Sequence, residues 1–270
     1  MSMIWHSDDY PEEAAISLGG WLRVVLRGGA IIGLIGLCLP LLLIARGAER
    51  LIVGARRPIS AFFPKFVSRA AFFILGIKHK TRGEQMRHAG AVVSNHGSWL
   101  DIFALNARKR VFFVSKAEVS KWPGIGFMAR STGTVFINRD RREARLHIAQ
   151  FEERLRAGHK LLFFPEGTST DTLRVLPFKT TLFAAFYAPE LIDLMHIQPV
   201  TLRYSAPIGA DARFYGWWGD MEFGAHLLKV LAARKQGTVE VVYHAPLKVR
   251  DFEGRKALAA HCEAVVRSAL

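Results

Sequence analysis

AVVSNHGSWLDIFALN, residues 91–106, contains the clearest change of pattern in the chain. Its first residues form a short apolar run, which is typical of a strand covered on both faces. The polar residues SNHGS, 94–98, follow, and the pattern of WLDIFALN, 99–106, then predicts a helix. A strand, a turn and a helix in this order predict an α/β fold. They also place His96 at the carboxyl end of a strand, where sites in open α/β sheets usually lie.

The same alternation continues along the chain. Further short apolar runs predict strands at 111–116, 133–138, 161–165, 197–204 and 238–244. The clearest helix is expected over 140–158, with a capping pair (Asp140, Glu143), one apolar face (Ala144, Ile148, Phe151, Leu155) and a closing Gly158. We therefore predict a central mixed, largely parallel sheet flanked by helices. A change of texture after Ile77 divides the chain into an N-terminal helical segment, 1–77, and an α/β domain, 78–270.

Composition limits the classes of partner. The chain has 270 residues, of which 50% are apolar and 22% charged, so an intrinsically disordered protein is excluded. Two cysteines far apart in sequence suggest neither a disulfide framework nor a zinc site, and they fit a cytoplasmic setting. The formal charge of +14 indicates an anionic partner: nucleic acid, anionic lipid, or an acidic substrate or carrier.

The N-terminal segment favours a membrane. The run GGAIIGLIGLCLPLLLIA, 28–45, is uncharged and lies at the lower limit for crossing a bilayer as a helix. Pro40 interrupts it, arginines stand on both sides, and a second mixed apolar segment follows at 59–77. We expect a two-helix element that dips into one leaflet and leaves both flanks on the cytoplasmic side. A single membrane-spanning helix is the alternative, and the pattern leaves both open.

His96 and Asp101 form the first candidate site. Five residues apart on a continuous helix, two side chains point about 140° away from each other. They meet only if His96 lies on the turn before the helix. A histidine base whose ring is held by a carboxylate is suited to taking a proton from an alcohol. In the structural alternative, Ser98 and Asp101 form a capping box and have no catalytic role.

A second loop follows another predicted strand. In FFPEGTST, 163–170, Gly167 permits close approach of the backbone to a ligand, Thr168 offers a hydroxyl, and Glu166 brings a charge that needs a polar partner. Lys179 lies downstream and is suited to meeting an anion. A tight turn without a ligand explains the same residues equally simply.

Four segments in order resemble the motif blocks of the glycerolipid acyltransferases, the family of 1-acyl-glycerol-3-phosphate acyltransferase. They are NHGSWLD (95–101), GTVFINR (133–139), FPEGTST (164–170) and IQPV (197–200). The resemblance implies direct transfer of a fatty acyl group from a thioester, acyl carrier protein or coenzyme A, to a lysolipid hydroxyl. It implies neither a metal nor a cofactor beyond that co-substrate, and no nucleic-acid partner.

The resemblance also implies roles for single residues. His96 is expected to be the general base and Asp101 its orienting acid. The residues expected to bind substrate are Asn95, Ser98, Arg139, Glu166, Gly167, Thr168 and Lys179, with Arg139 as the anion-binding group. Pro199, in the fourth block, is expected to shape the acyl side. The apolar N-terminal segment and the basic charge predict a location at the cytoplasmic membrane, with the active domain on its cytoplasmic face and in contact with anionic lipid.

One position departs from the pattern. Ser169 stands where enzymes that act on lysophosphatidic acid usually carry arginine, so the planar fork suited to phosphate is missing. EGTST followed by VLPFK looks closer to the acyltransferases that complete ornithine lipids. The acceptor is therefore either 1-acyl-glycerol-3-phosphate or lyso-ornithine lipid. The competing class is a non-catalytic basic protein that binds membrane or nucleic acid.

Overall fold

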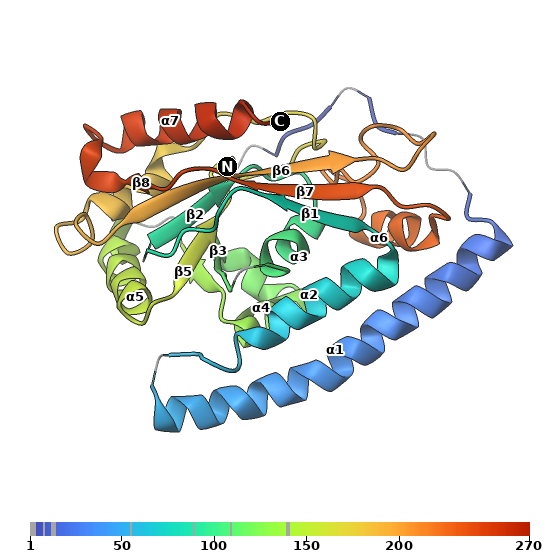
Figure 1. Ribbon diagram of the computed structural model, residues 1–270, viewed down its shortest axis with the longest axis horizontal. Coiled ribbons are helices and arrows are strands. Elements are labelled where there is room, and N and C mark those ends of the chain that lie inside the picture. Colours follow the sequence, from blue (N-terminus) through green and yellow to red (C-terminus); the bar gives the residue numbers. More distant parts are fainter. Residues whose placement is uncertain are drawn as a thin grey trace.

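A mixed sheet forms the centre of the computed structural model, which describes residues 4–7, 9–11, 15–54, 56–88, 90–108, 110–138 and 141–270 (Figure 1). The strands are β1 Lys78–Arg82, β2 Gly90–Ser94, β3 Phe112–Lys116, β4 Val135–Ile137, β5 Lys160–Phe163, β6 His196–Ser205, β7 Thr238–Tyr243 and β8 Leu247–Lys248. Their order is β1-β7-β6-β2-β5-β3-β4, with β8 also paired to β6. Every strand expected from the sequence is present, and the predicted α/β class is confirmed.

Most neighbouring strands run in the same direction. From β4 through β3, β5 and β2 to β6 the pairs are parallel, whereas β7 and β8 run antiparallel to β6. The carboxyl ends of β2 and β5 therefore open on the same edge of the sheet, which brings the loops after Ser94 and Phe163 together. The sheet is mixed and largely parallel, as predicted.

The helices cover both faces of the sheet. They are α1 Leu18–Ile52, α2 Phe62–Leu75, α3 Leu100–Asn106, α4 Ile125–Thr132, α5 Ala144–Arg156, α6 Phe223–Ala232 and α7 Arg255–Arg267, with short 3-10 helices η1 Ala117–Lys121, η2 Arg141–Glu143, η3 Thr180–Tyr187 and η4 Val249–Asp251. One core joins the sheet to α5, η3 and α7, and the other joins it to α2, α3 and α6. In Figure 1, α7 lies above the sheet, and α1 and α2 lie below it. Consecutive strand residues feed opposite cores, with Val92 on one face and Val93 on the other.

The helix predicted over 140–158 is α5, which begins after the 3-10 turn η2. Phe151 and Leu155 are buried on its apolar face, as expected. Gly158 ends the segment at φ 79° and donates its N–H to the Leu155 carbonyl at 2.9 Å. Asp140, the expected capping residue, lies outside the described residues.

The N-terminal segment contains two helices, α1 and α2. Pro40 was expected to interrupt the first, but α1 continues through it to Ile52. A proline inside a helix removes one backbone hydrogen bond and is tolerated when the rest of the helix is maintained. By length and composition α1 is the one helix in the described part of the chain that could cross a membrane, and only 11% of its most apolar window is buried.

Arginines fasten both ends of α1 to the rest of the protein. Near its start, Arg23 and Arg27 donate to the Ala232 and Leu231 carbonyls at the end of α6, at 2.7 and 2.8 Å. Near its end, Arg46 donates to the Arg130 and Ser131 carbonyls of α4, at 2.9 and 2.7 Å. Helix carboxyl ends carry unpaired carbonyls and partial negative charge, so cations are favourable partners there. Thus α1 lies along the domain from α6 to α4, as Figure 1 shows, and whether 1–77 forms a separate domain stays a prediction.

Candidate active site

His96 and Asp101 meet at the turn between β2 and α3. The Asp101 Oδ2 atom accepts from the His96 Nδ1 atom at 2.7 Å, and from the N–H groups of Gly97 and Ser98 at 2.9 and 3.0 Å. The last bond is one half of a capping box, and the first holds the imidazole ring. The two interpretations of the motif are therefore compatible, because a single oxygen serves both.

The other oxygen of Asp101 is bound from a distant strand. The Tyr204 hydroxyl, on β6, donates to the Asp101 Oδ1 atom at 2.6 Å. Asp101 is fully buried. The burial of Tyr204, and after it the charge of the neighbouring Asp101, raises the pKa of the Tyr204 hydroxyl well above its ordinary value. Tyr204 thus stays protonated and remains a donor. No local pattern pointed to it, since it lies 103 residues from Asp101 in sequence.

The His96 ring keeps one nitrogen available. Because the Nδ1–H group donates to Asp101, the Nε2 atom carries the free electron pair. Phe164 stacks on the ring with centroids 4.1 Å apart and planes 13° apart. The side chain is 21% exposed, and Nε2 has no hydrogen-bond partner within the described residues. The imidazole ring is therefore held by Asp101 at Nδ1 and by Phe164 on one face, with Nε2 left available.

Glu166 ties the second loop to the first. Its two carboxylate oxygens accept from the backbone N–H groups of His96 and Leu176, each at 2.7 Å. Burial raises the pKa of Glu166 to about 8, against the lowering effect of these two bonds. The Thr170 N–H adds a bond to the His96 carbonyl at 2.9 Å. Both backbone groups of His96 are therefore held by the FPEGTST loop, and Glu166 acts by positioning His96.

Two expected substrate-binding residues are turned into the fold. The Asn95 side chain donates to the Leu202 carbonyl at 2.9 Å and accepts from the Leu202 N–H at 2.8 Å. The Ser98 hydroxyl is fully buried and accepts from the Leu100 N–H at 3.3 Å. Asn95 thus joins the end of β2 to β6, and Ser98 supports the start of α3. Contact of either with a substrate remains a prediction without support from these bonds.

The residues after Glu166 lie nearer the surface. Gly167 adopts φ 70°, and an added Cβ there would lie 2.7 Å from the Lys179 Nζ atom, so the lysine crosses directly over the glycine. The Thr168 hydroxyl accepts from the N–H of Trp5 at 3.4 Å, so the N-terminal segment reaches this loop. Arg139 lies outside the described residues, and its anion-binding role stays a prediction.

Strain accompanies the tight packing behind His96. Thr172 has φ 71°, the one positive value at a non-glycine residue in the described chain. A side chain at Gly97 would come within 2.7 Å of its methyl group, so the two loops touch at backbone distance. Backbone strain of this kind often accompanies functional sites. Gly97 could be recognised in the sequence as part of the turn, whereas Thr172 gave no signal.

The comparisons with known proteins identify the family. The profile of the Acyltransferase family matches residues 77–203, which include both loops. Lyso-ornithine lipid O-acyltransferase of Rhodobacter capsulatus is 55% identical over 99% of this chain and 97% of its own length. The protein of that name from Brucella abortus is 37% identical, over 80% of this chain and 83% of its own. The 1-acyl-sn-glycerol-3-phosphate acyltransferase of Neisseria gonorrhoeae is 33% identical over 66% of this chain and 68% of its own.

A solved structure shares the fold. The 1-acyl-sn-glycerophosphate acyltransferase of Thermotoga maritima matches with a TM-score of 0.61 and 19% identity, covering 93% of this chain and 96% of that one. The relatives rule out the non-catalytic alternative, since all those named here are acyltransferases. The chain is an enzyme and belongs to the acyltransferase family.

Proposed function

We propose that this enzyme transfers a fatty acyl group from an acyl thioester to the free hydroxyl of a lysolipid. The His96 Nε2 atom takes the hydroxyl proton as the oxygen attacks the thioester carbonyl. Collapse of the tetrahedral intermediate breaks the carbon–sulfur bond, and the departing sulfur takes the proton back from the imidazolium. Atoms and charge then balance without an acyl-enzyme. A base of this kind contributes about a hundred- to ten-thousand-fold in rate.

The bond between His96 and Asp101 is the observation that carries this proposal. At 2.7 Å from Nδ1, a buried carboxylate fixes the tautomer and stabilises the imidazolium that forms during attack. The carboxylate is itself immobilised by Tyr204 and two backbone N–H groups. Such a charge needs no rearrangement as the reaction proceeds, which is the condition for efficient electrostatic stabilisation.

We propose lyso-ornithine lipid as the acceptor. Two relatives that bear this activity in their names, at 55% and 37% identity, are more similar to this chain than the 1-acyl-sn-glycerol-3-phosphate acyltransferase at 33%. Ser169 removes the usual arginine, and Arg174 does not replace it freely, because its Nη2 atom is 2.8 Å from the Asp171 carboxylate. The Arg174 guanidinium also lies 5.0 Å from the centre of the Trp5 ring. A phosphate monoester therefore meets no unengaged arginine among the described residues of this loop.

A comparison of two acceptors, each measured separately, tests this choice. Purified enzyme is given one acyl thioester with lyso-ornithine lipid or lysophosphatidic acid, and kcat/KM is measured for each. We expect lyso-ornithine lipid to be preferred, and Ser169→Arg to raise kcat/KM for lysophosphatidic acid about tenfold or more by adding a bidentate phosphate partner. Ser169→Lys is the matched control, since it adds charge without the fork. Preference of the unaltered enzyme for lysophosphatidic acid contradicts the acceptor assignment and leaves acyl transfer standing.

Panels of acyl-carrier-protein and coenzyme A thioesters assign the donor. Both remain candidates, and the basic surface suits either, since each carries negative charge. The same purified enzyme gives kcat/KM for each donor at one acyl length. We propose no cofactor beyond the thioester, and no group of three or more His, Cys, Asp or Glu side chains in the described chain is placed to hold a metal.

We further propose that α1 lies in the plane of the membrane on its cytoplasmic face. Its outer side exposes large apolar residues such as Leu22, Leu26 and Ile44, at 61, 62 and 69%. The arginine bonds at both of its ends keep it along the domain, and a transmembrane orientation requires the bonds at one end at least to break. Labelling of cysteines introduced at either end distinguishes the two, because an in-plane helix leaves both ends on one side.

A further inference from the structure

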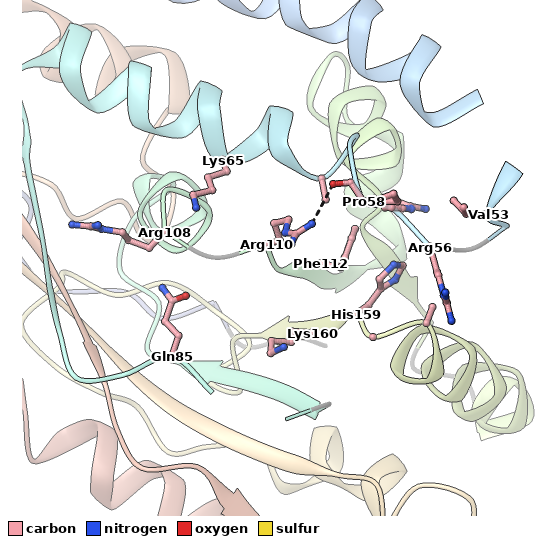
Figure 2. A pocket seen from close by; sticks show the side chains of 14 residues that line it. Val53, Arg56, Pro58, Lys65, Gln85, Arg108, Arg110, Phe112, His159 and Lys160 are labelled. Carbon is pink, nitrogen blue, oxygen red and sulfur yellow. Dashed lines mark hydrogen bonds between the residues drawn. The ribbon is translucent and has the colours of Figure 1, made fainter. Parts of the chain in front are cut away.

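A cavity of about 590 Å³ lies at the edge of the sheet opposite His96. It is bounded by the starts of β3 and β5, by the connection between α1 and α2, and by the residues that follow α3. Figure 2 shows Lys65 of α2 among the lining side chains, and Arg110 turned toward the Pro58 carbonyl, to which it donates at 3.2 Å. Since His96 follows the carboxyl end of β2, this cavity is separate from the active site.

Positive charge dominates the lining. Six lining side chains are Lys or Arg: Arg56, Arg57, Lys65, Arg108, Arg110 and Lys160. No Asp or Glu is among the lining residues that the structure describes. Burial, followed by Arg154 and Arg46, lowers the pKa of Arg57 to about 9. Like charges gathered without a lining anion repel one another, so a bound anion would relieve the repulsion.

One carboxylate that acts on Arg57, Glu49, is already engaged. Glu49, at the end of α1, accepts from the Ile59 N–H at 2.5 Å and from the Ser60 N–H at 2.9 Å. It also accepts from the Ser60 hydroxyl at 2.5 Å. These bonds fold the connection between α1 and α2 around Glu49. Glu49 and Glu153 both act on Arg57, but neither lines the cavity.

A buried, neutral histidine lies in the wall of the cavity. His159 lines the cavity, is 5% exposed, and packs against Phe112 with ring centroids 4.2 Å apart. Burial and the cations Arg154 and Arg57 lower its pKa to about 3, so it is neutral. The Arg154 guanidinium, 3.3 Å from Nδ1, can only donate, so Nδ1 accepts and Nε2 carries the hydrogen. That Nε2–H group is buried without a partner in the described chain, and it requires an acceptor.

Apolar side chains surround the same connection. Val53, Ile59 and Phe62 are 39, 60 and 52% exposed, and Val53 itself lines the cavity. They continue the exposed apolar face of α1 and α2. A cluster of cations beside exposed apolar groups is the arrangement by which proteins bind an anionic membrane surface.

We propose that this cavity binds the phosphate group of an anionic membrane phospholipid, with its acyl chains against the exposed apolar residues of the α1–α2 connection. The exposed lining cations Arg56, Arg108 and Arg110 pair with the phosphate oxygens. This inference rests on the membrane association stated under the proposed function. The site has a role in anchoring, and it takes no part in the transfer step at His96.

Vesicle binding by matched charge variants tests the site. The pocket variant carries Arg56→Gln, Arg108→Gln and Arg110→Gln, all exposed positions. The control carries Lys248→Gln, Arg255→Gln and Lys256→Gln, exposed positions on β8 and α7 that lose the same charge. Affinity for phosphatidylglycerol vesicles should fall about a hundredfold in the pocket variant, from about fivefold for each cation. Vesicle affinity of the control should change by about threefold or less, since α7 lies on the side of the sheet away from α1 and α2 (Figure 1) and distant charges are screened by salt.

Two further arms separate the possible outcomes. Titration calorimetry with inorganic phosphate and with coenzyme A tests whether a soluble phosphate uses the cavity. The lipid assignment is overturned if the pocket variant loses coenzyme A binding but keeps its vesicle binding. It is also overturned if the pocket variant and the control lose vesicle affinity equally. Arg56→Gln alone, expected to lose about fivefold, replaces the triple variant if that melts below the control. Turnover on detergent-dispersed substrate should be unchanged in every variant, and its absence in the unaltered enzyme contradicts the proposed function instead.

Discussion

Asp101→Asn separates the charge of the carboxylate from its hydrogen bonds. The Oδ2 atom faces three donors, and Oδ1 faces the Tyr204 hydroxyl alone. An asparagine that places its oxygen at the Oδ2 position keeps all three bonds. Its NH₂ group then donates to Tyr204, whose hydroxyl rotates to accept. The opposite orientation sets an NH₂ group against two backbone N–H groups and is therefore excluded.

The size of the effect follows from this orientation. The tautomer of His96 is retained, so the loss is the attraction between the carboxylate and the imidazolium that forms in the transition state. At about 4 Å and an effective dielectric constant of about 20 this is about 4 kcal/mol. That corresponds to about a thousandfold in kcat. With the bonds kept, the free energy of unfolding should change by less than about 1.5 kcal/mol.

The assay follows release of free thiol from the acyl thioester in the presence of saturating lysolipid, beside thermal unfolding of the same preparation. Asp101→Ala is a poorer test, because it leaves four donors without an acceptor and damages the fold. A kcat within about tenfold of the unaltered enzyme, or a loss of rate that only follows a loss of stability, refutes the orienting role. The capping role alone then explains the residue.

Three further substitutions extend the test. His96→Ala should abolish turnover and leave membrane association and the fold intact; retained turnover in the purified variant contradicts the base assignment. Tyr204→Phe should cost about 1–3 kcal/mol in the free energy of unfolding, because the buried Asp101 Oδ1 atom loses its donor, and should reduce kcat less than Asp101→Asn, as the charge remains. The pKa of Glu166 is about 8 in the folded protein and 4.5 ordinarily. Its contribution to stability is therefore fully present below pH 4.5 and is lost as the pH rises through about 8. Denaturation between about pH 5 and about pH 8 should therefore show stability falling by up to about 1.4 kcal/mol per pH unit in the unaltered enzyme, and a flatter profile in Glu166→Gln.

The predictable part of the fold is the part in which neighbouring residues carry the signal. β2 and β5 consist mostly of consecutive apolar residues in a doubly covered sheet, and β6 is buried from residue 197 to residue 202, so their runs stand out in the sequence. β1 was missed because its residues, KHKTR, are mostly exposed at the edge of the sheet, where packing does not require apolar side chains. β8 has two residues, too few for any pattern.

The candidate site divides in the same way. The meeting of His96 and Asp101 could be predicted because the strand, turn and helix around them are local. Tyr204 could not, since its contact depends on β6 lying beside β2, which only the completed sheet establishes. The substrate-binding role expected of Glu166 came from its motif. Its bonds to the backbone of His96 and Leu176 depend on how the two loops pack, which only the structure shows.

The arginine bonds at the two ends of α1 have a geometric consequence for catalysis. Because α1 cannot tilt without breaking bonds to α4 or α6, a bilayer that holds α1 also sets the height of His96 above the lipid surface. A lysolipid hydroxyl then has to rise to one fixed level to be acylated. With α1 in the membrane plane as proposed above, the distance from headgroup to hydroxyl becomes a selection criterion, and acceptors of similar charge but different reach are distinguished by depth.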